Sequence, residues 1–197
     1  MIERIAINLV AQMTEERLIH KDMEERYVYV AVSWIEKFIT VISIVVISIV
    51  VKQLLPTLFF LLFFLGLRKR TGGYHLNKFY QCYLSTIASY LAVLMISVNA
   101  ESYFKLMLAI WLLATCTIVI IGTVNHPNIH MDSEELTESK KAARMIVLLE
   151  GSIILFCVLL GADITFISYM AMAVILCALL LCVAKILKQE VKGNEED

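Results

Sequence analysis

Long apolar runs separated by short polar segments make up most of the chain from residue 27 onward. Unbroken runs of this kind favour spanning helices over the alternating strands of an outer-membrane barrel. Six segments are predicted to be helical, at Tyr27–Val51, Leu54–Leu67, Phe79–Val98, Tyr103–Val124, Met145–Gly161 and Ile164–Leu187. The second segment is short, because a bilayer takes about 20 residues to cross. The pattern predicts an all-α polytopic membrane protein with about six transmembrane helices.

The first 26 residues have a different pattern. Apolar side chains recur there at helical spacing, at Ile2, Ile5, Leu9, Val10 and Met13, with charged residues mostly off that stripe. This predicts an amphipathic helix, which either lies on the membrane or packs on the protein itself. The order of charged and apolar residues differs from that of a cleavable signal peptide, so a cytoplasmic N-terminus is expected. We expect one membrane domain over 1–197, with an amphipathic segment at 1–26, a helical bundle at 27–187 and a polar tail at 188–197.

Composition agrees with a membrane environment. Hydrophobic residues make up 60% of the chain and charged residues 18%, which is too apolar for the surface of a water-soluble domain. The formal net charge of −1 predicts no nucleic-acid partner. With six spans and a cytoplasmic start, the outer turns keep only Lys52 and Lys105, and the other loop cations fall inside. Two larger loops, Arg68–Lys78 and Asn125–Arg144, are therefore expected in the cytoplasm.

The candidate chemistry lies in the run RKRTGGYHLNKFYQC, from Arg68 to Cys82, where one apolar segment ends and the next begins. A nucleophilic thiol needs a base within reach and a site that substrate can enter. His75 and Cys82 would lie about 10 Å apart on one straight helix. The next helix must therefore begin after His75, with Gly72 and Gly73 allowing the chain to fold back. The alternative is a solvated interfacial histidine and a cysteine that only packs.

This run, with its basic residues, its Gly-Gly-x-His element and its cysteine seven residues after the histidine, resembles the signature of the accessory gene regulator protein B (AgrB) family. Members are membrane endopeptidases of peptide quorum sensing. The resemblance implies that Cys82 is the nucleophile, that His75 is general base and then acid, and that Arg68 is the family's basic position. It further implies cleavage of the C-terminal tail of a small AgrD-like precursor through a thioester, release of a cyclic thiolactone or lactone, a homodimer and no cofactor.

Other residues leave alternatives open. Arg68, Lys69 and Arg70 can dock an acidic precursor tail, or can serve topology and bind anionic lipid. Glu150 lies in an apolar segment and is either a functional carboxylate or the partner of Arg144 in an ion pair.

His126 and His130 carry no metal motif, so no metal is expected. The remaining cysteines, Cys116, Cys157, Cys177 and Cys182, are expected to pack as small hydrophobic residues.

A rival hypothesis from another class is a non-catalytic membrane carrier or scaffold for an amphipathic peptide. In that protein His75 and Cys82 would be structural. The two hypotheses differ at one atom, because only the enzyme needs the sulfur of Cys82.

Overall fold

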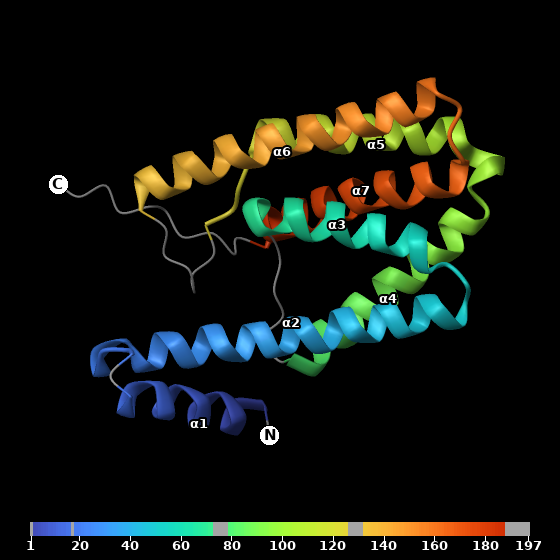
Figure 1. Cartoon of the computed structure of the whole chain (residues 1–197). Coiled ribbons are helices and arrows are strands. Elements are labelled where there is room, and N and C mark those ends of the chain that lie inside the picture. Colours follow the sequence, from blue (N-terminus) through green and yellow to red (C-terminus); the bar gives the residue numbers. More distant parts are fainter. Residues whose placement is uncertain (1, 17, 73–78, 126–131, 188–197) are drawn as a thin grey trace.

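The computed structural model describes residues 2–16, 18–72, 79–125 and 132–187 (Figure 1). Within these ranges the α-helices are α1 (Ile2–Glu15), α2 (Glu24–Val50), α3 (Leu54–Thr71), α4 (Phe79–Val98), α5 (Phe104–Ile121), α6 (Ser133–Leu159) and α7 (Ile164–Ile186). Short 3-10 helices precede α2, at Lys21–Met23, and α5, at Ala100–Tyr103. The described residues contain no strand, so the predicted all-α fold is confirmed.

Five of the described helices are long and apolar enough to cross a membrane: α2, α4, α5, α6 and α7. α3 has 18 residues, and its last turn carries Arg68, Lys69 and Arg70. It is the helix that the sequence predicted to be short. The chain direction alternates from α2 to α7, so α3 still runs back through the bundle beside α7 (Figure 1). The fold is that of a polytopic membrane protein, as the apolar pattern predicted.

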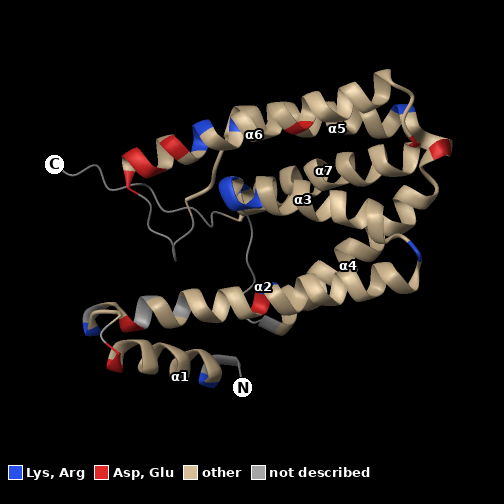
Figure 2. Cartoon of the chain, in the orientation of Figure 1, with Lys and Arg blue, Asp and Glu red and all other residues tan. Residues whose placement is uncertain are grey.

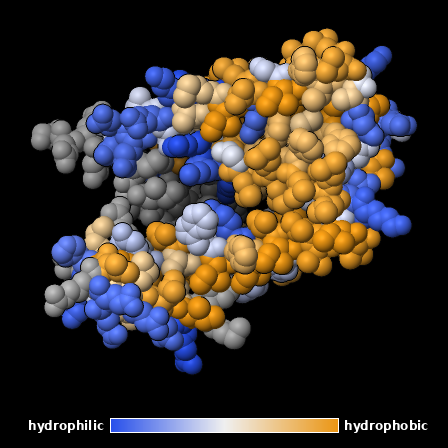
Figure 3. Space-filling view, in the orientation of Figure 1, coloured by the Kyte–Doolittle hydropathy of each residue, from blue (hydrophilic) through white to orange (hydrophobic). Residues whose placement is uncertain are grey.

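Hydrophobic side chains cover the middle of the molecule, and hydrophilic ones gather toward the two ends of the helices (Figure 3). Many large apolar side chains in this middle zone are exposed, among them Leu62, Leu113 and Phe156. An apolar belt between two polar ends is the surface that a bilayer requires of a helical bundle.

Several predicted boundaries are wrong near the polar end of the bundle. α3 continues to Thr71 instead of Leu67, so Arg68–Thr71 is helix rather than part of a loop. α6 begins at Ser133, so Ser133–Arg144 is helix rather than part of a loop. The cause is a cap, because the Asp132 carboxylate accepts a hydrogen bond from the Glu135 amide at 2.7 Å. α5 ends at Ile121 instead of Val124, because Gly122 follows it with φ at 75°.

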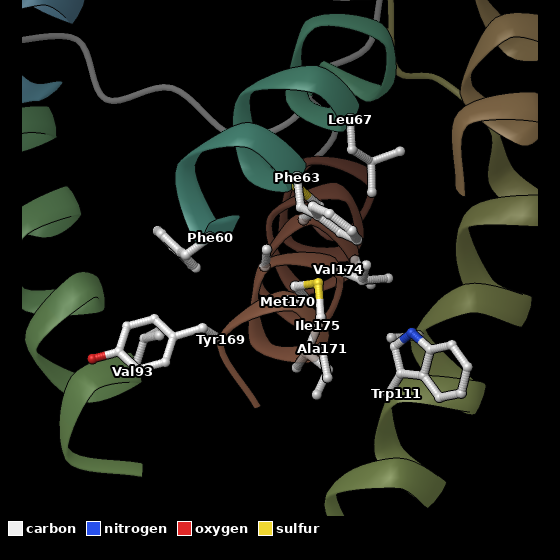
Figure 4. Close-up of a cluster of buried hydrophobic side chains, with 14 of the residues drawn as sticks. Phe60, Phe63, Leu67, Val93, Trp111, Tyr169, Met170, Ala171, Val174 and Ile175 are labelled. Atoms are coloured by element: carbon white, nitrogen blue, oxygen red, sulfur yellow. The ribbon is translucent and has the colours of Figure 1, made fainter. Parts of the chain in front are cut away.

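The core of the bundle forms where α3 packs on α7. Phe60, Phe63 and Leu67 of α3 lie against α7 near Met170 and Val174 (Figure 4). On α7, small side chains are buried at Ala171, Ala173, Ala178 and Ala184, which lets neighbouring backbones approach closely. This contact holds one face of α3 against α7, although α3 is the shortest predicted apolar segment. The other face of α3, with Leu55, Leu58 and Leu62, is exposed.

The amphipathic helix α1 packs on α2, with Ala6 and Val10 buried. Of the two arrangements left open by the sequence, the structure shows the one in which the helix packs on its own protein. Ile5 and Leu9 nevertheless remain about half exposed, at 52% and 50%. An apolar edge of α1 is therefore free to contact lipid.

Glu150 of α6 turns inward and is 7% exposed. Its Oε1 atom would lie 3.6 Å from a Cβ placed on Gly66 of α3. Its Oε2 atom has no hydrogen-bond partner. Arg144 instead donates from Nε to the Val119 carbonyl at 2.8 Å, so the ion-pair hypothesis for Glu150 and Arg144 is wrong.

Candidate active site

The end of α3 is closed by its own residues. The Gly72 amide donates to the Arg68 carbonyl at 3.2 Å, and the Arg68 guanidinium donates back to the Gly72 carbonyl. Gly72 has φ at 65° and ψ at −138°, a backbone conformation that only glycine adopts readily. The chain therefore leaves α3 in a direction set by Gly72 and held by Arg68.

A second segment, from the end of α5, is bound to this turn. The Thr123 hydroxyl donates to the Arg70 carbonyl at 2.8 Å, and the Val124 amide donates to the Thr71 carbonyl at 3.1 Å. We call these two hydrogen bonds the clasp. Thr71, Thr123 and Val124 are each at most 1% exposed. Buried backbone groups that have lost water need such partners, so the clasp satisfies carbonyls that the end of α3 leaves free.

The clasp also brings two backbones into close contact. A Cβ built on Gly72 would lie 2.9 Å from the Val124 carbonyl oxygen. That separation is closer than carbon and oxygen tolerate, so a side chain at position 72 would push the two segments apart. Asn125, the next residue after the clasp, is also buried.

Cys82 is the fourth residue of α4, which begins at Phe79. It is half-buried. Its carbonyl accepts a hydrogen bond from the Thr86 hydroxyl at 2.8 Å. The next residue, Tyr83, donates from its hydroxyl to Ser43 of α2 at 3.0 Å, which ties this turn to the bundle.

Arg68 connects the end of α3 with the start of α4. Its guanidinium lies within electrostatic range of the thiols of Cys82 and Cys177. Cys177 is buried and its thiol contacts the Phe64 carbonyl at 3.7 Å, as a packing residue would. The Cys82 thiol is thus half-buried and interacts electrostatically with the Arg68 guanidinium.

Basic side chains gather around this turn. Lys69 and Arg70 are exposed at the end of α3, and Lys141 and Arg144 are exposed on α6 at the same end of the bundle (Figure 2). α2 and α6 both extend past the end of α3 there (Figure 1). We call these four exposed cations, Lys69, Arg70, Lys141 and Arg144, the cationic floor. Their positive charge suits an anionic segment of a partner.

Of the residues singled out in the sequence, Arg68 and Gly72 are in direct contact, and Cys82 lies among the first described residues of α4. Two others, Gly73 and His75, lie outside the described residues. Within the described ranges, no three His, Cys, Asp or Glu side chains gather as a metal site would require. His126 and His130 lie outside those ranges.

Sequence reasoning missed Thr123 and Val124, which it counted as the end of a membrane helix. One local signal could have separated them, because Gly122 is a glycine at the end of an apolar helical run and such glycines commonly stop helices. Their contact with α3, in contrast, joins residues 53 positions apart and leaves no local pattern.

An all-α membrane bundle with a half-buried cysteine in a first helical turn, beside an arginine and a clasped glycine turn, defines a polytopic membrane protein with a candidate thiol site. A family model described as accessory gene regulator B matches residues 2–185. Because the match covers most of the chain, the chain belongs to the accessory gene regulator B family. Comparison with curated proteins and with solved structures found no match.

Membership of this family gives the chain a coarse function. It is a bacterial membrane protein that takes part in peptide processing for accessory gene regulator quorum sensing. Its partner is an AgrD-like precursor peptide.

Gly72→Ala tests the close contact at the clasp, with Gly161→Ala as its matched control. Gly161 also has positive φ, at 66°, but a Cβ there would meet nothing within 4 Å. Both variants place an alanine at positive φ, and this costs more at Gly72, whose ψ of −138° lies in a region that only glycine adopts readily. Only Gly72→Ala adds a collision, so thermal unfolding in detergent should show it to be less stable than Gly161→Ala by at least about 1 kcal/mol. Equal stability of the two variants would contradict the contact.

Proposed function

We propose that the chain is a membrane cysteine endopeptidase that removes the C-terminal tail of an AgrD-like precursor and promotes cyclisation of the remainder. The observation that carries this proposal is the position of Cys82, half-buried among the first described residues of α4 and in electrostatic interaction with the Arg68 guanidinium, in a chain of this family. His75, seven residues earlier in the sequence, is the proposed base.

In the first step, His75 takes the thiol proton and the Cys82 sulfur attacks the carbonyl carbon of the precursor bond. The carbon–nitrogen bond then breaks, His75 returns the proton to the leaving amine, and the tail departs. The rest of the precursor stays on Cys82 as a thioester. Free amides in the first turn of α4 are suitable donors to the transient oxyanion.

In the second step, a thiol or hydroxyl within the bound precursor attacks the thioester carbonyl. His75 takes the proton of that thiol or hydroxyl, the carbon–sulfur bond to Cys82 breaks, and Cys82 leaves as a thiolate. The product is a cyclic thiolactone or lactone. Water must stay away from the thioester meanwhile, and a site at the edge of the apolar belt helps to exclude it.

The cationic floor suits the acidic tail of such a precursor. Lys69 and Arg70 are exposed there, and Arg68 lies behind them against Gly72. Charge-assisted hydrogen bonds from these residues to carboxylates would hold the tail while the bond before it is cut.

We further propose that this end of the bundle faces the cytoplasm, because cations concentrate there while Lys52 and Lys105 lie at the opposite end. Lys52→Cys and Glu138→Cys, each in a chain whose other cysteines are replaced by serine, test the orientation. A membrane-impermeant maleimide should label Lys52→Cys in intact cells and Glu138→Cys only after lysis. The reverse result would invert the topology.

The enzyme proposal is tested with the purified protein in lipid vesicles and the precursor encoded beside its gene. Intact mass spectrometry should show release of the tail and a precursor adduct on the wild-type chain, because the acyl group is held as a thioester. Cys82→Ala should form no adduct and release no tail, and His75→Ala should lose most of both.

Two further variants sharpen that experiment. Cys182→Ala, which removes another half-buried thiol, should keep wild-type cleavage. Cys82→Ser separates the enzyme from a carrier, since a carrier would keep its function with a hydroxyl in place of the sulfur. Cleavage that persists in Cys82→Ala, or binding of the precursor without any cleavage by the wild-type chain, would refute the dyad.

A further inference from the structure

The clasp links the two longer connections at the polar end of the bundle. One of them leaves α3 at Gly72 and leads toward Cys82, and the other leaves α5 and passes through Thr123. Only one side chain takes part in the clasp as a donor, the Thr123 hydroxyl, which reaches the Arg70 carbonyl at 2.8 Å. The other clasp bond is donated by the Val124 backbone.

The hydrogen bond of the Thr123 hydroxyl ends on another segment, unlike those of Thr115 and Thr117. Thr115 and Thr117 of α5 donate to carbonyls four residues earlier in their own helix, at 3.0 Å and 2.8 Å. Those bonds are local and leave the helix unchanged when removed. The bond from Thr123 instead crosses between two segments and ends on the last turn of α3, two residues before Gly72.

A path of contacts leads from Thr123 to the reactive thiol. The Arg70 carbonyl belongs to the same helical turn as Arg68, whose guanidinium holds the Gly72 carbonyl and lies within electrostatic range of Cys82. Movement of this turn would displace both the guanidinium and the start of the segment that Gly72 directs. Displacements of about 1 Å in a supporting group can slow catalysis by about 100-fold.

We infer that Thr123 is a positioning residue for the reaction at Cys82. It acts through the last turn of α3, and the connection after α5 is therefore a built part of the active site. The expected effect of Thr123 on precursor cleavage rests on the proposed function. Its expected effect on the reactivity of the Cys82 thiol does not.

The experiment compares Thr123→Val, which removes the hydroxyl and keeps the shape, with Thr123→Ser, which restores the donor. Thr115→Val is the matched control, because it removes a hydroxyl whose bond stays within α5. Two rates are measured in vesicles: cleavage of the precursor as kcat and KM, and alkylation of Cys82 by iodoacetamide across a range of pH. Thermal unfolding of each variant is recorded in parallel.

Thr123→Val should lower kcat by about 10- to 100-fold with little change in KM, since the tail still meets the same cations. It should also slow alkylation of Cys82 by at least about threefold near neutral pH, because the last turn of α3, whose Arg68 guanidinium interacts with the thiol, is no longer held in place. Thr123→Ser should recover most of both rates. Thr115→Val should match the wild type in both.

Alkylation of Cys82 in Thr123→Val at the wild-type rate would overturn the inference, and so would an equal loss of rate in Thr115→Val. A fall in thermal stability alone, with kcat and alkylation unchanged, would show a merely structural hydroxyl and would also overturn it. Absence of precursor cleavage in the wild-type chain would refute the proposed function. The alkylation comparison would still decide the role of Thr123 in that case.

Discussion

The candidate site depends on how the last turn of α3 is held. This turn carries the basic residues, ends in the glycine that directs the chain toward the reactive cysteine, and lies where backbone carbonyls have lost their helical partners. The two bonds of the clasp, from Thr123 and Val124, satisfy carbonyls in this turn with donors from α5. Without such donors, buried carbonyls at a membrane boundary would each cost free energy, and the turn would open toward water.

The rest of the bundle keeps this turn in the interior. α3 is too short and too polar at its end to be stabilised by lipid alone, and its packing on the small residues of α7 compensates. α2 and α6 extend past it on either side and carry much of the remaining charge (Figure 2). The packing of α3 on α7, the cationic floor and the thiol of α4 therefore belong to one arrangement of helices.

Much of this could be predicted from the sequence, because apolar runs and charged turns are local signals. The runs located every helix from α2 to α7. The predicted helix start between His75 and Cys82 falls partly outside the described residues and stays a prediction. The polar beginning of α6 could not be found from apolar runs, since it is specified by a cap at Asp132. The clasp could not be found either, because a bond between backbone segments far apart in sequence depends on how α3 and α5 both pack on α7.

Amide hydrogen exchange at Val124 is the most direct measurement of the clasp. The protein would be studied in lipid nanodiscs, with the Glu134 amide, in the exposed first turn of α6, as the fast-exchanging reference. The account predicts that the Val124 amide exchanges as slowly as amides inside α5, because it donates to the Thr71 carbonyl in a buried contact. Exchange of the Val124 amide as fast as that of Glu134 would contradict the account, since the two connections would then be unbound.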